Sequence, residues 1–191
     1  ATLTVFTPAY NRAHTLPRTY ESLQKQSCKD FVWLIVDDGS KDQTAKLVKE
    51  WQQQEKTFEI RYIYKENGGM HTAHNVAYEN IDTELNVCID SDDCMADGAV
   101  KKIIDTWDYA GLIGLDADFK GNIIGKGFPE HLKETTLGDY YAAGGQGDKK
   151  LVYRTDVINS VPPYPVFEGE KYVGLVYKYT LVDQKYKLFV M

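Results

Sequence analysis

Acidic side chains gather directly after an apolar run, where Leu85–Ile89 is followed by Asp90, Asp92 and Asp93. Carboxylates this close repel one another unless a cation offsets their charge. The natural partner is a hard divalent metal with oxygen ligands, often shared with a substrate phosphate. One acid would then hold a ribose hydroxyl, and the other would bind Mn²⁺ or Mg²⁺ that bridges a diphosphate. The alternatives are a solvent-exposed loop and a calcium loop, but the glycine and final glutamate of a calcium loop are absent at the required offsets.

The elements that must position these acids follow a regular alternation in the first half of the chain. Continuous apolar runs, typical of strands covered on both faces, alternate with stretches whose apolar residues recur at helical spacing. The expected strands are 3–6, 31–36, 60–64 and 85–89, and the expected helices lie near 16–23, 42–51, 70–78 and 100–107. This order predicts an α/β fold, a Rossmann-like and mostly parallel sheet with helices on both faces.

Polar loops follow all four of these strands. Ligands bind outside the carboxyl ends of the strands in such a sheet. The loops in question are 8–12, 37–40, 66–69 and 90–93. Four strands in succession therefore deliver polar and acidic groups to one edge, which we expect to be the functional site.

Each loop also has a plainer interpretation. Tyr10 can stack on a base, but Pro and Asn are common in any turn. Asp37 and Asp38 can accept a base N–H, or Asp-Gly can make the turn and cap the helix. The Gly68-Gly69 pair permits close approach of a ligand to the backbone.

Two histidines follow the glycine pair at a spacing that disfavours zinc. His71 and His74 are three residues apart. A zinc helix would need His-x-x-x-His and a third ligand nearby. Either histidine can therefore be structural.

The second half of the chain is less regular and completes a single domain over residues 1–191. Strands are expected at 111–115, 123–127 and 187–191, and a helix at 171–182. Residues 1–110 form the regular half of this domain, and residues 111–191 form a mixed second half. The abrupt start and end suggest a piece of a longer chain.

Composition narrows the class of partner. A net charge of −6 without a basic stripe disfavours nucleic acid. No apolar stretch approaches the ~20 residues of a membrane span. The three cysteines lack zinc-like spacing, and an odd count without a signal peptide favours a reducing compartment. We therefore expect a cytoplasmic location, with peripheral attachment to the inner face of a membrane as the alternative.

The four loops together resemble those of the family 2 glycosyltransferases, which have the A-type nucleotide-diphospho-sugar transferase fold. The matching segments are 7–12, 36–44, 66–69 with Ala73 and Asn75, and 89–93, and they cover roughly the first 110 residues. The resemblance implies a nucleotide-diphospho-sugar donor, usually a UDP-sugar, and inverting transfer to an acceptor hydroxyl. Residues 1–110 would then be the nucleotide-sugar-binding half, and residues 111–191 the acceptor-side half. It further implies a role in a bacterial cell-surface polysaccharide and a glycan or lipid-linked acceptor.

Site residues follow from this resemblance position by position. The nucleotide-binding loop would comprise Thr7, Pro8, Ala9, Tyr10 and Arg12. Asp38 would contact uracil, Asp90 with Ser91 the ribose or sugar, and Asp92 the metal. The third motif would comprise Asn67, Gly68, Gly69, His74 and Asn75, with His74 where many members carry Arg.

The general base is expected on the acceptor side. The segment Phe167–Lys171 resembles a branch of the family with a Glu-Gly-Glu-Lys pattern, so Glu170 is our first choice of base and Glu168 our second. Either can instead be a helix-start acid. By charge alone, Lys150 and Arg154 would line the donor or acceptor wall.

Two other functions remain open. A nucleotidyltransferase of similar fold generally needs a glycine-rich basic segment after the first strand, and residues 8–18 contain no glycine. The chain can also be a catalytically inactive sugar-nucleotide-binding module or fragment.

Overall fold

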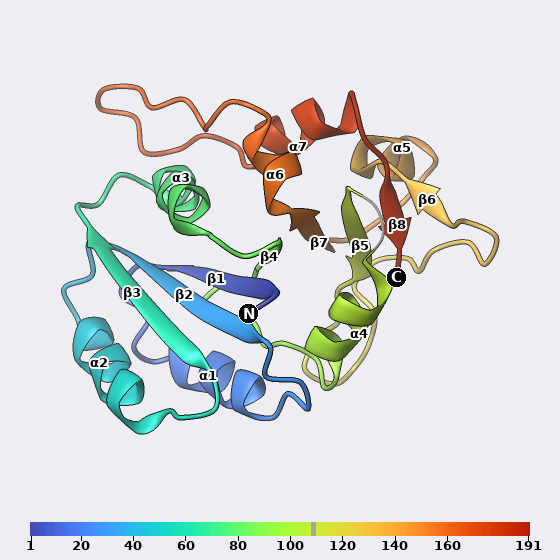
Figure 1. The fold of residues 1–191 in the computed structure, drawn as a ribbon. Helices are drawn as coiled ribbons and strands as arrows, with labels where there is room; N and C mark the ends of the chain where they lie inside the picture. Colours follow the sequence, from blue (N-terminus) through green and yellow to red (C-terminus); the bar gives the residue numbers. More distant parts are fainter. Residues whose placement is uncertain (108–109) are drawn as a thin grey trace.

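One mixed β-sheet runs through the computed structural model, which describes residues 1–107 and 110–191 (Figure 1). The eight strands lie in the order β3-β2-β1-β4-β7-β5-β8-β6. The strands are β1 (Leu3–Ala9), β2 (Phe31–Asp38), β3 (Glu59–Lys65), β4 (Leu85–Cys88), β5 (Gly111–Leu115), β6 (Glu134–Thr135), β7 (Lys149–Arg154) and β8 (Leu188–Val190).

Strands β1 to β4 pair in parallel, as their apolar runs predict. Strand β7 enters antiparallel between β4 and β5, so β5 again points the same way as β1. Strand β8 is parallel to β5, and the short β6 is antiparallel to β8. The expected α/β fold is therefore confirmed. The carboxyl ends of β1 to β5 and the amino end of β7 all meet at one edge.

Helices cover both faces of this sheet (Figure 1). Helices α1 (Leu16–Gln24), α2 (Thr44–Gln54) and α4 (Ala99–Thr106) pack on one face, and α3 (Met70–Asn80), α5 (Leu137–Ala142), α6 (Thr155–Asn159) and α7 (Val176–Asp183) on the other. On the first face, Trp33 of β2 stacks with Tyr20 and Trp51 at 5.8 Å between ring centroids. On the second, Phe6 meets Tyr78 edge-on at 5.3 Å.

Some expected elements differ from those observed. Strand β1 continues past Phe6 to Ala9, because Thr7, Pro8 and Ala9 keep pairing with β2. The expected strand at 123–127 is wrong; within it only Ile123 pairs, in an isolated bridge with Ala117. The expected helix from residue 171 begins instead at Val176. Strand β7 was not expected, because its sequence mixes lysines with apolar residues.

The part of the chain that the structure describes contains no helix that could span a membrane. None of its helices combines the length and the apolar character that crossing a bilayer requires.

Candidate functional site at the carboxyl edge of the sheet

The loop after β1 is tied to the loop after β2. The amide of Asn11 donates to Ser40 Oγ at 2.8 Å, and Asn11 Oδ1 accepts from the amide of Lys41 at 2.8 Å. Asn11 adopts a φ of 52°, a left-handed conformation that asparagine tolerates. These contacts leave Tyr10 47% exposed at the edge.

Only some side chains of the predicted nucleotide-binding loop, residues 7–12, are accessible to a ligand. Thr7, Pro8 and Ala9 are buried in β1, and Thr7 Oγ1 accepts a hydrogen bond from Trp33 Nε1 at 2.9 Å. These three residues can offer a ligand only their backbone groups. Tyr10 and the half-buried Arg12 remain as side chains that a nucleotide can reach.

Asp38 joins the second loop to the third. Its Oδ1 accepts from Lys65 Nζ at 2.6 Å and from the amide of Gly68 at 2.9 Å. Its Oδ2 accepts from Asn67 Nδ2 at 3.0 Å and from the amide of Gly69 at 2.9 Å. A carboxylate has about four lone-pair positions. A uracil N–H could therefore bind Asp38 only if one of these donors gave way.

The turn at Gly68 and Gly69 contacts the Phe167–Lys171 loop, which is far away in the sequence. Gly69 has a φ of 104°, and a Cβ built there would lie 2.1 Å from the Lys171 carbonyl oxygen. Lys171 Nζ also donates to Asn67 Oδ1 at 2.8 Å. The Phe167–Lys171 loop, expected to carry the general base, therefore lies directly against the third loop.

Asn75 supports the segment that leads into this loop. Its side-chain amide donates to the Tyr164 carbonyl at 2.9 Å and accepts from the Tyr164 amide at 2.8 Å. Both polar atoms of Asn75 thus bind backbone. Its position fits a structural role better than the expected contact with substrate.

His74 does not lie on the open edge. It is 0% exposed, and its ring packs edge-on against Phe6, Tyr78 and Tyr164. Burial lowers the pKa of His74 to about 3, and nearby His71 and Lys178 act in the same direction. The expected substrate contact at this position does not fit the structure. The α3 helix turns this face toward the core, which the sequence alone did not reveal.

Helix α1 holds the acidic loop after β4. Arg18 Nη2 donates to the Asp92 carbonyl at 2.9 Å, and Thr19 Oγ1 donates to the Asp93 carbonyl at 2.6 Å. The Asp92 side chain is exposed, and the described residues give its carboxylate no hydrogen bond or ion pair. Asp92 is therefore free to take a ligand, whereas Ser91 is buried.

Lys150, at the amino end of β7, sits among three acids. Its Nζ lies 2.8 Å from Asp93 Oδ2 and 3.5 Å from Asp116 Oδ2. Burial by itself lowers the pKa of Lys150, but the hydrogen bond to Asp93 and the charges of Asp116 and Asp90 raise it above the ordinary value. Burial also raises the pKa of Asp90, and Lys150 opposes this effect. Lys150 thus stays charged beside the acids.

Asp116 was missed in the sequence, although a signal for it existed. It follows directly on the apolar run of β5, just as Asp37 follows the apolar run of β2 and Asp90 that of β4. Arg154 was placed wrongly with Lys150. It lies at the opposite end of β7, where it pairs with Asp156 and stands opposite Leu85.

The donor set at this edge fits a metal only if a substrate completes the coordination. Among residues 1–107 and 110–191, no three His, Cys, Asp or Glu side chains are arranged to hold an ion. Asp92 offers one free carboxylate. Mg²⁺ is commonly bound by one or two carboxylates together with substrate phosphates. Asp92 therefore fits an Mn²⁺ or Mg²⁺ ion that arrives with a diphosphate.

The two base candidates lie on the exposed loop. Glu168 and Glu170 are both open to solvent, and Glu170 Oε1 accepts from the amide of Tyr172 at 3.0 Å. The contact of Lys171 with Gly69 brings this loop to the same edge as the third loop. The geometry does not separate the two glutamates.

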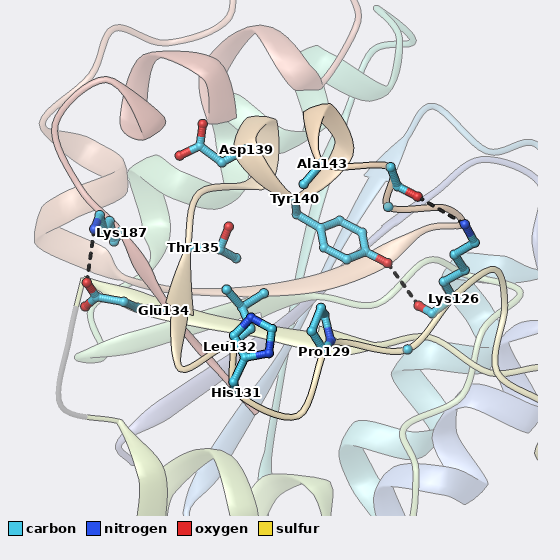
Figure 2. Close-up of a pocket in the computed structure, with 13 residues that line it drawn as sticks. Lys126, Pro129, His131, Leu132, Glu134, Thr135, Asp139, Tyr140, Ala143 and Lys187 are labelled. Atoms are coloured by element: carbon cyan, nitrogen blue, oxygen red, sulfur yellow. Dashed lines mark hydrogen bonds and ion pairs between the residues drawn. The ribbon is translucent and has the colours of Figure 1, made fainter.

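A cavity of about 480 Å³ lies elsewhere, between α5, β6 and the segment around Pro129 (Figure 2). Figure 2 shows Tyr140 pointing across it toward Lys126, whose carbonyl accepts the Tyr140 hydroxyl at 2.9 Å. None of the expected site residues lines this cavity. The candidate site is the open edge of the sheet.

The sequence of this chain is similar to those of known glycosyltransferases. The family described as "Glycosyl transferase family 2" matches residues 4–158. The glycosyltransferase GlyA of Streptococcus pneumoniae is 31% identical over 107 residues, which are 54% of this chain and 15% of GlyA. The teichoic acid poly(glycerol phosphate) polymerase of Staphylococcus epidermidis is 35% identical over 99 residues, 51% of this chain and 14% of that protein. The chain thus spans a small part of these relatives.

Solved structures share the fold at low sequence identity. The S. aureus TarS 1–349 structure matches all of this chain with a TM-score of 0.76 and 22% identity, over 58% of its own length. TarS 1–349 has also been solved in complex with UDP-GlcNAc. The mannosyltransferase PcManGT from Pyrobaculum calidifontis, in complex with GDP-Man and Mn²⁺, matches with a TM-score of 0.70 and 15% identity, over 56% of its length.

Proposed function

Because this chain belongs to glycosyl transferase family 2, we propose that it is the catalytic domain of an inverting, metal-dependent transferase. It moves a sugar from a nucleotide-diphospho-sugar to an acceptor hydroxyl. One observation carries the proposal. The exposed, unpaired carboxylate of Asp92 stands at the edge where the loops after β1, β2, β3 and β4 meet.

The donor that we propose is a UDP-sugar. The exposed Tyr10 ring offers a stacking surface for a base, and the UDP-GlcNAc complex of TarS, which shares the fold, supports a uridine donor. The similarity to a teichoic acid polymerase of S. epidermidis supports a role in bacterial cell-surface polymers. The acceptor would be a glycan or a lipid-linked saccharide, reached from the cytoplasm.

The residues at the edge have separate roles in this reaction. Asp92 would hold Mn²⁺ or Mg²⁺ together with the donor diphosphate, and the metal supplies positive charge for the departing diphosphate. Asp90 orients the ribose or sugar hydroxyls. Lys150, charged beside Asp93 and Asp116, adds a second positive group near the phosphates.

The Phe167–Lys171 loop supplies the base. Glu170, or in its place Glu168, takes the proton from the acceptor hydroxyl as that oxygen attacks the anomeric carbon. Both carboxylates are exposed, so each can meet an acceptor that arrives from solvent.

Calorimetry with UDP and Mn²⁺, followed by assays of donor hydrolysis and transfer, tests the proposal. Asp92→Asn should lower turnover by about 10²–10³-fold, because the charge that stabilises the leaving group is lost. Asp97→Asn, an exposed acid on the same loop, is the matched control and should retain activity. Both variants should keep the melting temperature of the parent protein. Near-normal metal-dependent transfer by Asp92→Asn would rule out the role of Asp92.

The same measurements separate the rival functions. Binding of UDP and Mn²⁺ without hydrolysis or transfer would favour an inactive binding module. Release of pyrophosphate from a nucleoside triphosphate would favour a nucleotidyltransferase. A complete lack of UDP binding would contradict both the transferase and the module.

A further inference from the structure

The exposed ring of Phe119 lies near the Asp90–Asp93 loop, which carries the proposed metal ligand Asp92. Phe119 is 64% exposed, although the Arg18 guanidinium covers one of its faces at 3.9 Å from the ring centroid. The same guanidinium donates to the Asp92 carbonyl at 2.9 Å. Two short contacts therefore join the ring to the loop that carries the proposed metal ligand.

Phe119 lies on a short hairpin, residues 116–124, that is closed by an Ala117–Ile123 bridge and by hydrogen bonds. At its tip, the Asp118 carboxylate accepts hydrogen bonds from the amides of Lys120 and Asn122 and from the Asn122 side chain. At its base, the Ile124 amide donates to the Asp116 carbonyl at 2.8 Å. A ring on a preorganised turn loses little conformational entropy when it binds a ligand.

The base of the hairpin is also tied to the catalytic edge. Asp116 Oδ2 lies 3.5 Å from Lys150 Nζ, which in turn bonds Asp93. The Asp116–Ile124 segment is thus connected to the Asp90–Asp93 loop at two points, at Phe119 through Arg18 and at Asp116 through Lys150.

We propose that Phe119, backed by Arg18, is a binding platform for the acceptor sugar ring. This inference rests on the proposed transfer reaction, because it places the acceptor beside the Asp92 loop. The open face of the ring carries the negative part of the aromatic quadrupole. The C–H groups on one face of a pyranose pack against such a surface, and the carboxylates and Lys150 nearby can bind its hydroxyls.

Measurements of glycoside binding and of reaction rates in Phe119 variants test whether this ring binds the acceptor. The probes are methyl glycosides of glucose, galactose and N-acetylglucosamine, with UDP and Mn²⁺ present and saturation-transfer NMR as the readout. Phe119→Ala should weaken binding of the recognised glycoside by about 2- to 10-fold. Phe119→Trp should restore it. Ile123→Ala, which removes another exposed apolar side chain from the same hairpin, is the matched control and should bind normally.

Acceptor-free hydrolysis of the UDP-sugar distinguishes this inference from the proposed function. Phe119→Ala should hydrolyse the donor at the parental rate while its KM for the glycoside acceptor rises. Equal losses of hydrolysis and transfer would overturn the platform, because the ring would then act only by supporting the Asp92 loop. Unchanged glycoside binding, or no glycoside binding by the parent protein, would also overturn it. Loss of UDP binding in the parent protein would instead contradict the proposed function itself.

Discussion

Single carboxylates at the edge have opposite local environments. Asp38 has all its acceptor positions filled by Lys65, Asn67, Gly68 and Gly69, so it organises two loops. Asp92, by contrast, is exposed with no partner among the described residues. Asp38 therefore holds two loops in place, whereas the carboxylate of Asp92 is open to a ligand.

Asp90 should destabilise the fold while it serves the site. Burial, together with Asp93 and Asp92, raises the pKa of Asp90 above its ordinary value, and Lys150 only partly opposes this. The folded state therefore binds this proton more tightly than the unfolded chain, so the stability that the group contributes is present at low pH. It is lost as the pH rises through the unfolded and then the folded pKa.

Asp90→Asn should therefore raise the melting temperature at pH 7, where a gain of ~1 kcal/mol corresponds to about 2–4 °C in a domain of this size. The gain should disappear in acid, and binding of the UDP-sugar should weaken. Thermal melts at pH 7 and pH 4 check this, with Asp97→Asn as the exposed control. A lower melting temperature for Asp90→Asn at pH 7 would contradict the expectation.

At the scale of elements, Gly69 lets the loop after β3 pack closely against the Phe167–Lys171 loop, which carries the proposed general base. The backbone of Gly69 has a positive φ, and the space where its Cβ would lie is taken by the Lys171 carbonyl. Gly98 has a φ of +71° but nothing within 4 Å of the corresponding Cβ position. Gly69 also has a ψ of 160°, a region that essentially only glycine adopts, whereas Gly98 has a ψ of 3° and is left-handed.

Gly69→Ala should displace the Phe167–Lys171 loop, because the added Cβ would meet the Lys171 carbonyl and the backbone conformation suits only glycine. It should cost more than the ~1–2 kcal/mol of left-handed strain that Gly98→Ala introduces. Gly98→Ala should cost only that strain and retain transfer. Trypsin cleavage after Lys171 is the measurement, since a released loop is cut faster. Equal cleavage rates and equal stability in the two variants would show that the loop does not depend on its contact with Gly69.

At the scale of the whole molecule, the buried His74 links stability to pH. Its pKa is lowered to about 3 by burial, against about 6.5 in an unfolded chain. The unfolded state then binds the proton more readily below pH ~6.5, so stability falls as the pH drops from there toward 3. Between pH 6.5 and 5 this amounts to about 2 kcal/mol.

His74→Leu should therefore flatten the fall in unfolding free energy between pH 6.5 and 5. Urea unfolding across this range measures the slope, which is independent of any constant change in packing. His14→Leu, at an exposed position, should leave the slope unchanged. A slope that is the same in His74→Leu and the parent protein would assign the acid sensitivity to other groups.

The location of the candidate site at the carboxyl edge of the sheet could be predicted from the sequence by itself. Apolar runs of strand length are followed by the loops that carry Tyr10, Asp38 and Asp92, and parallel pairing brings such ends together wherever the chain folds as α/β. Periodicity and the placement of acids are local properties, so they can be read without coordinates. The parallel pairing of β1 to β4 and the meeting of their loops at one edge were predictable for that reason.

Only the tertiary structure decided which of these side chains face solvent and which distant segments meet. His74 turned inward and Asn75 clamped Tyr164, because the face that α3 presents to the sheet depends on packing. The contacts of Lys150 with Asp116 and of Arg18 with Phe119 join residues far apart in the chain. Such contacts depend on how strands are ordered across a sheet, and the antiparallel insertion of β7 that creates the first of them leaves no local pattern in the sequence.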